Sequence, residues 1–177
     1  IITINYNNLS GLKKTFASVL SQTYKDFEYI VIDGASNDGS AEEMAEHKDM
    51  ITYCLSEPDN GVYDAMNKGI KVATADYCIF MNSGDCFFTD NVVEKVAPLL
   101  DGTDILYGNT HYTDGKIRYS KDEPDLFSFF YVSCWCHQST FIKTSLLKKY
   151  LYDDSLRIVA DWKFLLQTVI KDNCSFK

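Results

Sequence analysis

The sequence lacks the glycine-rich motifs that mark several common nucleotide-binding and hydrolase folds. No G-x-G-x-x-G follows the first predicted strand, and no G-x-x-x-x-G-K-[ST] occurs in the 177 residues. These two absences disfavour a dinucleotide-dependent dehydrogenase and a P-loop enzyme. No G-x-S-x-G is present either, which argues against an α/β-hydrolase.

The chain also has little positive charge. Lysine and arginine together number 17 against 25 acidic residues, and the formal net charge is −8. A nucleic-acid-binding domain usually carries a basic face, so we expect no nucleic-acid partner. An acidic chain that handles a phosphorylated substrate would need a cation to screen the phosphates.

The cysteine spacing of a zinc site and any long apolar run are missing as well. No two of the six cysteines form a C-x-x-C pair, and Cys134-x-Cys136 stands alone. The sequence contains no signal peptide and no run of about 18 apolar residues. We therefore predict reduced thiols in a cytoplasmic protein that has no membrane-spanning segment of its own.

Both ends of the chain have the character of strands that lack flanking residues. Residues 1–4 are mostly β-branched, and residues 174–177 resemble the start of another strand. We therefore expect the chain to be cut from a longer protein at both ends. A missing segment could make peripheral contact with the inner face of a membrane.

Apolar runs alternate with amphipathic segments along the chain. Strands are predicted at 1–5, 27–32, 50–55, 77–81, 105–107 and 139–142, with a hairpin within 110–120. Helices are predicted from Ser10 as N-cap, from a capping box at 40–43, over 61–75 and 144–150, and from Asp161. This alternation predicts an α/β domain with a doubly wound parallel sheet. No repeat or linker is present, so residues 1–177 are predicted to form one domain.

Acidic side chains directly follow two of the predicted strands. Asp33 ends the second strand and Asp85 follows the fourth, and ligands of such sheets bind outside the carboxyl ends of the strands. Asp33 could accept a hydrogen bond from a base or ribose, and Asp85 could hold a divalent cation. Tyr6 could stack on a planar ring, and Asp161 begins a helix. Taken singly, each residue also fits ordinary turn or cap chemistry.

Four ordered segments resemble motifs of the family 2 glycosyltransferases. Residues 3–7 resemble the opening strand of that family, and residues 30–40 resemble its V-V-D-x-x-S-x-D-G-[ST] segment. Residues 57–69 are similar to a subgroup whose donor helix reads G-[IV]-Y-D-A-M-N-K-G. Residues 80–85 match the form that the DxD region takes in that subgroup. The resemblance runs from residue 1 to about residue 172.

The resemblance implies a GT-A fold, a doubly wound and mostly parallel sheet flanked by helices, with a smaller acceptor-side region. It implies inverting transfer of a sugar from a nucleoside-diphosphate sugar, with UDP as the default, and dependence on Mn²⁺ or Mg²⁺. The acceptor would be a hydroxyl of a saccharide or of a lipid-linked molecule in polysaccharide biosynthesis. Residues 1–100 would form the nucleotide-sugar-binding half and residues 101–177 the acceptor and catalytic half.

The same resemblance assigns roles position by position. Tyr6 would stack on the base, Asp33 would bind the edge of the base, and Asp85 would hold the metal. Asp161 would be the general base, and His137 would lie near the donor phosphates. The remaining donor-binding candidates are the three polar residues of the donor helix, Asp64, Asn67 and Lys68.

Several positions depart from the common family pattern and leave alternatives open. Asn82 and Gly84 stand where the usual D-x-D motif has two carboxylates, and Ala160 replaces the Glu that usually precedes the base. Met66 replaces a frequent Arg, so Lys68 would supply the cation instead. The reduced D-x-D motif keeps open a non-catalytic module that only holds a nucleotide sugar.

A sugar nucleotidyltransferase is a further alternative, because it shares the layout of the sheet. It would need a glycine-rich, basic loop after the first strand, and no cation occurs there before Lys13. The aromatic residues that crowd 127–135 predict either core packing or a platform for the acceptor.

Overall fold

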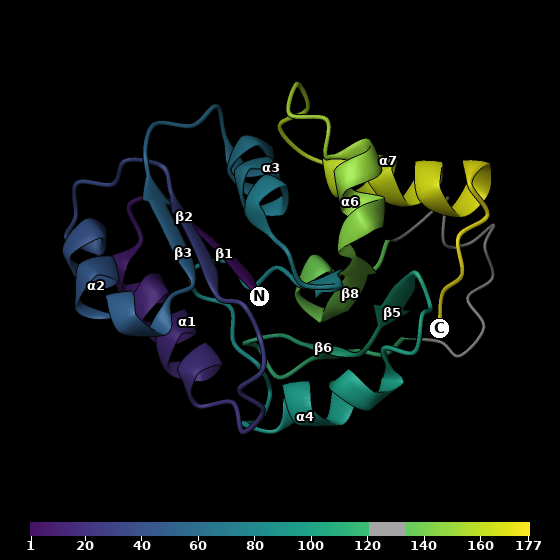
Figure 1. Ribbon diagram of the computed structural model, residues 1–177, viewed down its shortest axis with the longest axis horizontal. Helices are drawn as coiled ribbons and strands as arrows, with labels where there is room; N and C mark the ends of the chain where they lie inside the picture. The colour runs from purple at the N-terminus through teal and green to yellow at the C-terminus, as the bar shows by residue number, and fades with distance from the viewer. Residues whose placement is uncertain (121–133) are drawn as a thin grey trace.

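The computed structural model describes residues 1–120 and 134–177, and a parallel sheet forms its N-terminal part (Figure 1). The three strands pair side by side in the order β1 (Ile2–Asn5), β2 (Ile30–Asp33) and β3 (Tyr53–Ser56). Asn5 lies opposite Asp33, and Asp33 lies opposite Ser56. The register therefore brings three polar side chains together at the carboxyl ends of the strands.

Helices cover both faces of this sheet, as Figure 1 shows. They are α1 (Leu9–Leu20) and α2 (Ser40–Glu46) on one face and α3 (Val62–Val72) on the other. Successive side chains of a strand point to opposite faces, and β2 follows that rule. Ile30 and Ile32 pack in the core with α3, whereas Val31 packs in the core with α1. The predicted sheet flanked by helices on both faces is confirmed.

A second, smaller sheet forms after residue 76 and is antiparallel. Its strands pair in the order β4 (Tyr77–Cys78), β8 (Thr140–Lys143) and β5 (Ile105–Tyr107). A bridge between Ile2 and Phe80 joins the chain after β4 to β1 of the parallel sheet. The loop that follows Phe80 is thereby placed beside the carboxyl end of β1.

The remaining elements surround the second sheet. A predicted hairpin is present as β6 (Thr110–His111) and β7 (Ile117–Arg118), and the helices are α4 (Val92–Val96), α6 (Thr144–Tyr150) and α7 (Ala160–Leu166). Among the described residues, no helix is both long enough and apolar enough to cross a membrane. Most of the aromatic stretch predicted at 127–135 lies outside the described residues.

Several predicted element boundaries are wrong; the fourth strand, predicted at 77–81, covers only Tyr77–Cys78. Helix α1 begins at Leu9, and Asn8 rather than Ser10 caps it by accepting a hydrogen bond from the Gly11 amide. The capping box predicted at 40–43 does not form, because Ser40 already lies inside α2. Its hydroxyl donates instead to Asp38. The third strand starts three residues later than predicted, since residues 48–50 form a 3₁₀ turn.

The contact between α3 and β1 depends on a glycine. A Cβ at Gly69 would lie 2.6 Å from Cγ2 of Ile2, which is buried. We expect Gly69→Ala to destabilise the fold by about 1–2 kcal/mol, because overpacking a core costs about 1–3 kcal/mol and outweighs the better helix propensity of alanine. Urea unfolding measures this change. Gly108→Ala is the matched control, since the nearest atom to its Cβ would be 3.8 Å away.

Candidate active site

Asp33 is the hub of a buried hydrogen-bond network at the carboxyl ends of the parallel strands. Its side chain has no exposed surface. It accepts hydrogen bonds from Asn5 Nδ2 at 2.7 Å, from the amide and hydroxyl of Ser36, and from Ser56 Oγ at 2.6 Å. The structure therefore uses both carboxylate oxygens inside the protein. Neither oxygen is free in this structure to make the contact with a base edge that was predicted for Asp33.

Hydrogen bonding keeps this buried carboxyl ionised. Burial alone would raise the pKa of Asp33, but the hydrogen bonds from Ser36, Ser56 and Asn5 outweigh burial and hold the pKa below its usual value. The network continues through Asn5, because Ser83 Oγ donates to Asn5 Oδ1 at 2.8 Å. Asp33 thereby fixes the loop after β4 as well as the loop after β2.

We expect Asp33→Asn to lower the free energy of unfolding by about 2–3 kcal/mol near pH 7, since an amide cannot replace a carboxylate that accepts four hydrogen bonds. The folded-state pKa lies below the unfolded value of about 3.9. The contribution of the ionised carboxylate is therefore present above the unfolded pKa and is lost as the pH falls through the folded pKa. Urea unfolding at several pH values should show the two proteins converging below about pH 4; a constant difference would contradict this.

Tyr6 lies at the same end of the sheet and points into solvent. Its side chain is 67% exposed, and its ring edge borders Gly34, the residue after Asp33. Asp59 borders Gly34 as well. An open aromatic face above a glycine is suited to stacking by a planar ligand, as predicted for Tyr6.

Two of the donor-helix candidates lie in a charged cluster at the start of α3. Lys68 Nζ lies 2.9 Å from Glu57 and 3.7 Å from Asp64, and it donates to the Pro58 carbonyl at 2.9 Å. Asp64 also accepts a hydrogen bond from the Asn60 amide at 3.0 Å. Lys68, which was expected to bind the donor, therefore pairs with two acids. Its hydrogen bond to Pro58 stabilises the loop between β3 and α3.

Asn67, the third donor-helix candidate, is bound to the segment that precedes α7. It is buried, and its amide exchanges two hydrogen bonds of 2.8 Å with the backbone of Tyr152. Both polar atoms of the side chain are therefore occupied. These two hydrogen bonds join α3 to the segment that precedes α7, and they leave no polar side-chain atom free for the predicted donor contact.

The loop after β4 presents oxygen atoms suited to a hard cation. The pKa of Asp85 is raised, because burial disfavours its charged form more than His137, Gln138 and the Asn82 amide favour it. The Asn82 amide donates to Asp85 at 3.1 Å, and Asn82 Oδ1 is buried without a hydrogen-bond partner among the described residues. A buried oxygen without a hydrogen-bond partner is free to accept an electropositive partner.

These residues fit the predicted Mn²⁺ or Mg²⁺. The described part of the chain contains no group of three or more His, Cys, Asp or Glu side chains placed to hold a metal. Mg²⁺ is commonly held by one or two carboxylates, with substrate phosphates and water completing its shell. Asp85 and Asn82 Oδ1 would supply two oxygen ligands of that kind, and the donor phosphates would supply others.

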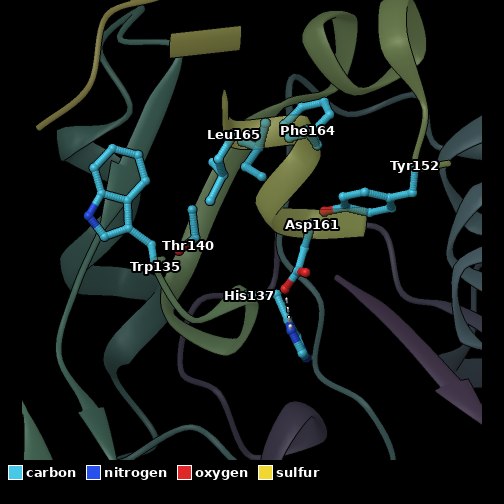
Figure 2. Close-up of a pocket in the computed structure, with 8 residues that line it drawn as sticks. Trp135, His137, Thr140, Tyr152, Asp161, Phe164 and Leu165 are labelled. Carbon is cyan, nitrogen blue, oxygen red and sulfur yellow. Dashed lines mark ion pairs between the residues drawn. The ribbon is translucent and has the colours of Figure 1, made fainter. Parts of the chain in front are cut away.

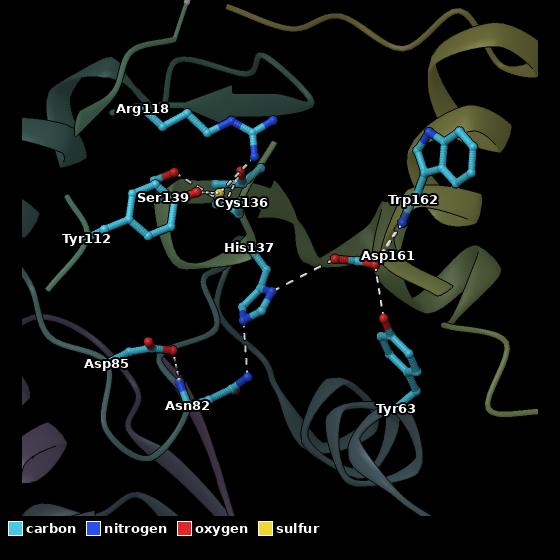
Figure 3. Close-up of polar contacts among 11 residues, drawn as sticks. Tyr63, Asn82, Asp85, Tyr112, Arg118, Cys136, His137, Ser139, Asp161 and Trp162 are labelled. Atoms are coloured by element: carbon cyan, nitrogen blue, oxygen red, sulfur yellow. Dashed lines mark hydrogen bonds and ion pairs between the residues drawn. The ribbon is translucent and has the colours of Figure 1, made fainter. Parts of the chain in front are cut away.

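Asp161 lies in the first turn of α7 and is held by three neighbours (Figure 3). One oxygen accepts hydrogen bonds from Tyr63 Oη at 3.0 Å and from the Trp162 amide at 2.9 Å. The other lies 3.9 Å from Nδ1 of His137. Burial alone would raise the pKa of Asp161, but His137, Tyr63 and the Trp162 amide together hold it below the usual value. The carboxylate is therefore ionised and able to accept a proton.

His137 connects this carboxylate to the loop after β4. Its Nε2 lies 3.1 Å from Nδ2 of Asn82, and Figure 3 shows the ring between Asn82 and Asp161. Since the amide nitrogen can only donate, Nε2 accepts, and the neutral ring then carries its proton on Nδ1, toward Asp161. The structure thus brings Asp85, His137 and Asp161, three of the predicted site residues, around one space.

A small cavity borders Asp161 and His137 (Figure 2). Its volume of about 10 Å³ is close to the room that one water molecule needs. Apart from Asp161 and His137, it is lined mainly by apolar side chains, namely Trp135, Thr140, Ile142, Tyr152, Phe164 and Leu165. The base candidate therefore borders an apolar part of the interior.

The comparison with known families identifies the family of this chain. The sequence model of Glycosyl transferase family 2 matches residues 1–169, which is nearly the whole chain. The chain belongs to this family. The GT-A fold that the motifs implied is supported by the solved structures described next.

Curated relatives and solved structures of glycosyltransferases resemble this family 2 chain over most of its length. An uncharacterised glycosyltransferase of Mycobacterium tuberculosis is 35% identical over 178 residues, which cover 96% of this chain and 68% of the relative. S. aureus TarS in complex with UDP-GlcNAc has a TM-score of 0.77 at 17% identity and covers 92% of this chain. The mannosyltransferase PcManGT of Pyrobaculum calidifontis, in complex with GDP-Man and Mn²⁺, has a TM-score of 0.67 at 16% identity and covers 88%. The chain spans about half the length of these two solved structures, 50% and 47%.

Three side chains of this family 2 site were not singled out from the sequence. Tyr63 binds Asp161, Asn5 links Asp33 to the loop after β4, and Asn82 contacts His137. All three lie within the motif segments, and Asn82 was considered only as a replaced ligand. Their position inside motifs is the signal that could have found them, but the motif does not show which partner each contacts.

Proposed function

We propose that this domain transfers a sugar, with inversion, from a UDP-sugar to a hydroxyl of a saccharide or lipid-linked acceptor in the synthesis of a polysaccharide. Residues 1–100 would bind the donor and residues 101–177 would bind the acceptor. The observation that carries this proposal is the ionised Asp161, joined through His137 to the loop that holds Asp85. The proposed location is cytoplasmic, where the nucleotide sugar is available, at the inner face of the membrane for a lipid-linked acceptor.

On the donor side, the loop after β4 would hold the diphosphate through a metal. Breaking the bond between sugar and phosphate leaves negative charge on the diphosphate, and a bound Mn²⁺ or Mg²⁺ stabilises that charge. Asp85 and Asn82 Oδ1 would ligate the ion, and Tyr6 would stack on the base. TarS is named in complex with UDP-GlcNAc, and PcManGT in complex with GDP-Man and Mn²⁺. These complexes support a nucleoside-diphosphate sugar as the donor and a divalent metal at the site.

On the acceptor side, Asp161 would remove the proton from the attacking hydroxyl. A hydroxyl is a weak nucleophile with a high pKa, so it needs a base within hydrogen-bond reach as the new bond forms. Tyr63 and the Trp162 amide fix one oxygen of Asp161 and leave the other directed toward His137. In-line attack from the side opposite the leaving group inverts the anomeric centre, so a single base suffices and no covalent enzyme intermediate is needed.

A donor screen tests this proposal. The protein is incubated with Mn²⁺ and a panel of sugar nucleotides, and release of nucleoside diphosphate is followed with and without simple saccharide acceptors. Release from one sugar nucleotide would establish the activity and name the donor. Binding of UDP without release from any donor, with or without acceptors, would instead favour a non-catalytic module that holds a nucleotide sugar.

A further inference from the structure

One carboxylate oxygen at the base-stacking surface has no hydrogen-bond partner within the described part of the chain. Asp59 uses Oδ1 to accept a hydrogen bond from the Gly61 amide at 2.9 Å. Its Oδ2 lies beside Gly34, where a Cβ would come within 2.5 Å of that oxygen and 3.1 Å of the Tyr6 ring. Asp59 Oδ2 and the exposed ring of Tyr6 therefore flank the same small space above Gly34.

Asp33 cannot offer a comparable oxygen in this arrangement. Its side chain has no exposed surface, and Asn5, Ser36 and Ser56 occupy both of its oxygens. A base that stacks on Tyr6 would extend its edge over Gly34, which lacks a side chain. The acceptor that this edge meets is Asp59 Oδ2.

We infer that Asp59 reads the base of the donor and selects a pyrimidine that carries a hydrogen on N3. The inference rests on the proposed function, because it assigns the base specificity of the same donor site. Asp59 rather than Asp33 then contacts the edge of the base, and Asp33 holds the loops after β2 and β4 in place.

The chemistry of the bases gives this carboxylate its selectivity. Uracil and thymine present an N3–H donor, whereas N3 of cytosine is an acceptor with a lone pair. A carboxylate accepts from the first and repels the second, and an unpaired acceptor facing an anion is costly. Since Oδ1 is already held by Gly61, one oxygen is available, which matches the single N3–H of a uracil or thymine ring.

Asp59→Asn reverses the polarity of this contact. The Gly61 amide needs an acceptor, so it holds Oδ1 of the asparagine and leaves Nδ2 facing the base. UDP would then meet a donor opposite its own N3–H, whereas CDP would meet a donor opposite its N3 acceptor. We expect UDP affinity to fall about 10- to 100-fold and the ratio of UDP to CDP affinity to fall at least as much.

Calorimetric titration of UDP and CDP, both with Mn²⁺, measures that ratio. The two pyrimidines have the same ring size and the same diphosphate, so the ratio cancels effects on the phosphates and on the metal. Glu57→Gln is the matched control, because it removes the same charge from the same loop, where the Glu57 carboxylate pairs with Lys68. Its ratio should equal that of the unmodified chain.

A second variant displaces the same oxygen by steric contact. Gly34→Ala places a methyl group 2.5 Å from Asp59 Oδ2, so the carboxylate must shift away from the base. We expect the UDP to CDP ratio to fall here too. Thermal unfolding of each variant shows whether the protein is still folded.

The outcomes separate this inference from the proposed function. If the unmodified chain binds neither nucleotide, donor binding fails and both proposals fall. If it prefers UDP and both Asp59→Asn and Gly34→Ala keep that preference, only the role of Asp59 is overturned. A preference shifted toward CDP in Asp59→Asn, with Glu57→Gln unchanged, supports the inference.

Discussion

Asp161→Asn is expected to lower sugar transfer by about 10²- to 10⁴-fold, the usual contribution of a general base, while UDP binding is retained. The asparagine oxygen can still accept the hydrogen bonds from Tyr63 and the Trp162 amide, so the first turn of α7 keeps its shape. The amide cannot accept a proton from the acceptor hydroxyl. The loss should therefore appear in kcat, measured by release of nucleoside diphosphate in the presence of acceptor.

Asp153→Asn is the control for this experiment. Asp153 precedes the same helix, pairs with Lys163 and does not contact His137 or Tyr63. Its replacement should leave transfer within about twofold, as for most changes away from the site. Normal transfer by Asp161→Asn would remove Asp161 as the base and direct attention to His137. Loss of both transfer and UDP binding would point to a structural defect instead.

The positions of Asp33 and Asp85 could be predicted because they depend on short-range patterns. Alternating apolar residues and turn residues locate the ends of strands, and a parallel topology places those ends at one edge. The hydrogen bonds of Asp33 could not be predicted in the same way. Ser36 lies in the loop after β2 and Ser56 ends β3, and no periodicity in the sequence links them to one carboxylate.

Contacts over long sequence separations explain the other differences. Asn67 lies in a motif that suggested donor binding, yet its partner Tyr152 is 85 residues away. Tyr63 lies in the same helix, and its partner Asp161 is 98 residues away. Helix α3 therefore contacts Asp161 from its first turn and the backbone of Tyr152 from its middle. The motif predicts neither contact, because helical periodicity shows which residues share a face but not what packs against that face.

The metal assignment gives the other large expected effect. Asp85→Asn is expected to abolish the increase in UDP affinity that Mn²⁺ provides, because Asp85 is the one carboxylate of residues 82–85 and the asparagine would carry no charge to balance the ion. Calorimetry compares UDP binding with Mn²⁺ and with a chelator. We expect the unmodified chain to bind UDP at least about tenfold more weakly with the chelator, since even disturbing the neighbours of metal ligands costs 10- to 100-fold in metal affinity.

Asp90→Asn supplies the control, because this exposed carboxylate binds Ser21 and lies outside the loop. It should keep the full difference between Mn²⁺ and chelator. Equal UDP affinity under both conditions in the unmodified chain would remove the metal and, with it, the role of Asp85. If Asp85→Asn retained the Mn²⁺ effect, we would expect the ion to be held by the diphosphate with Asn82 Oδ1, the buried oxygen that has no hydrogen-bond partner in the described part of the chain. Asn82→Leu would then be expected to abolish the Mn²⁺ effect while Asp85→Asn does not, so the pair of variants assigns the ligand.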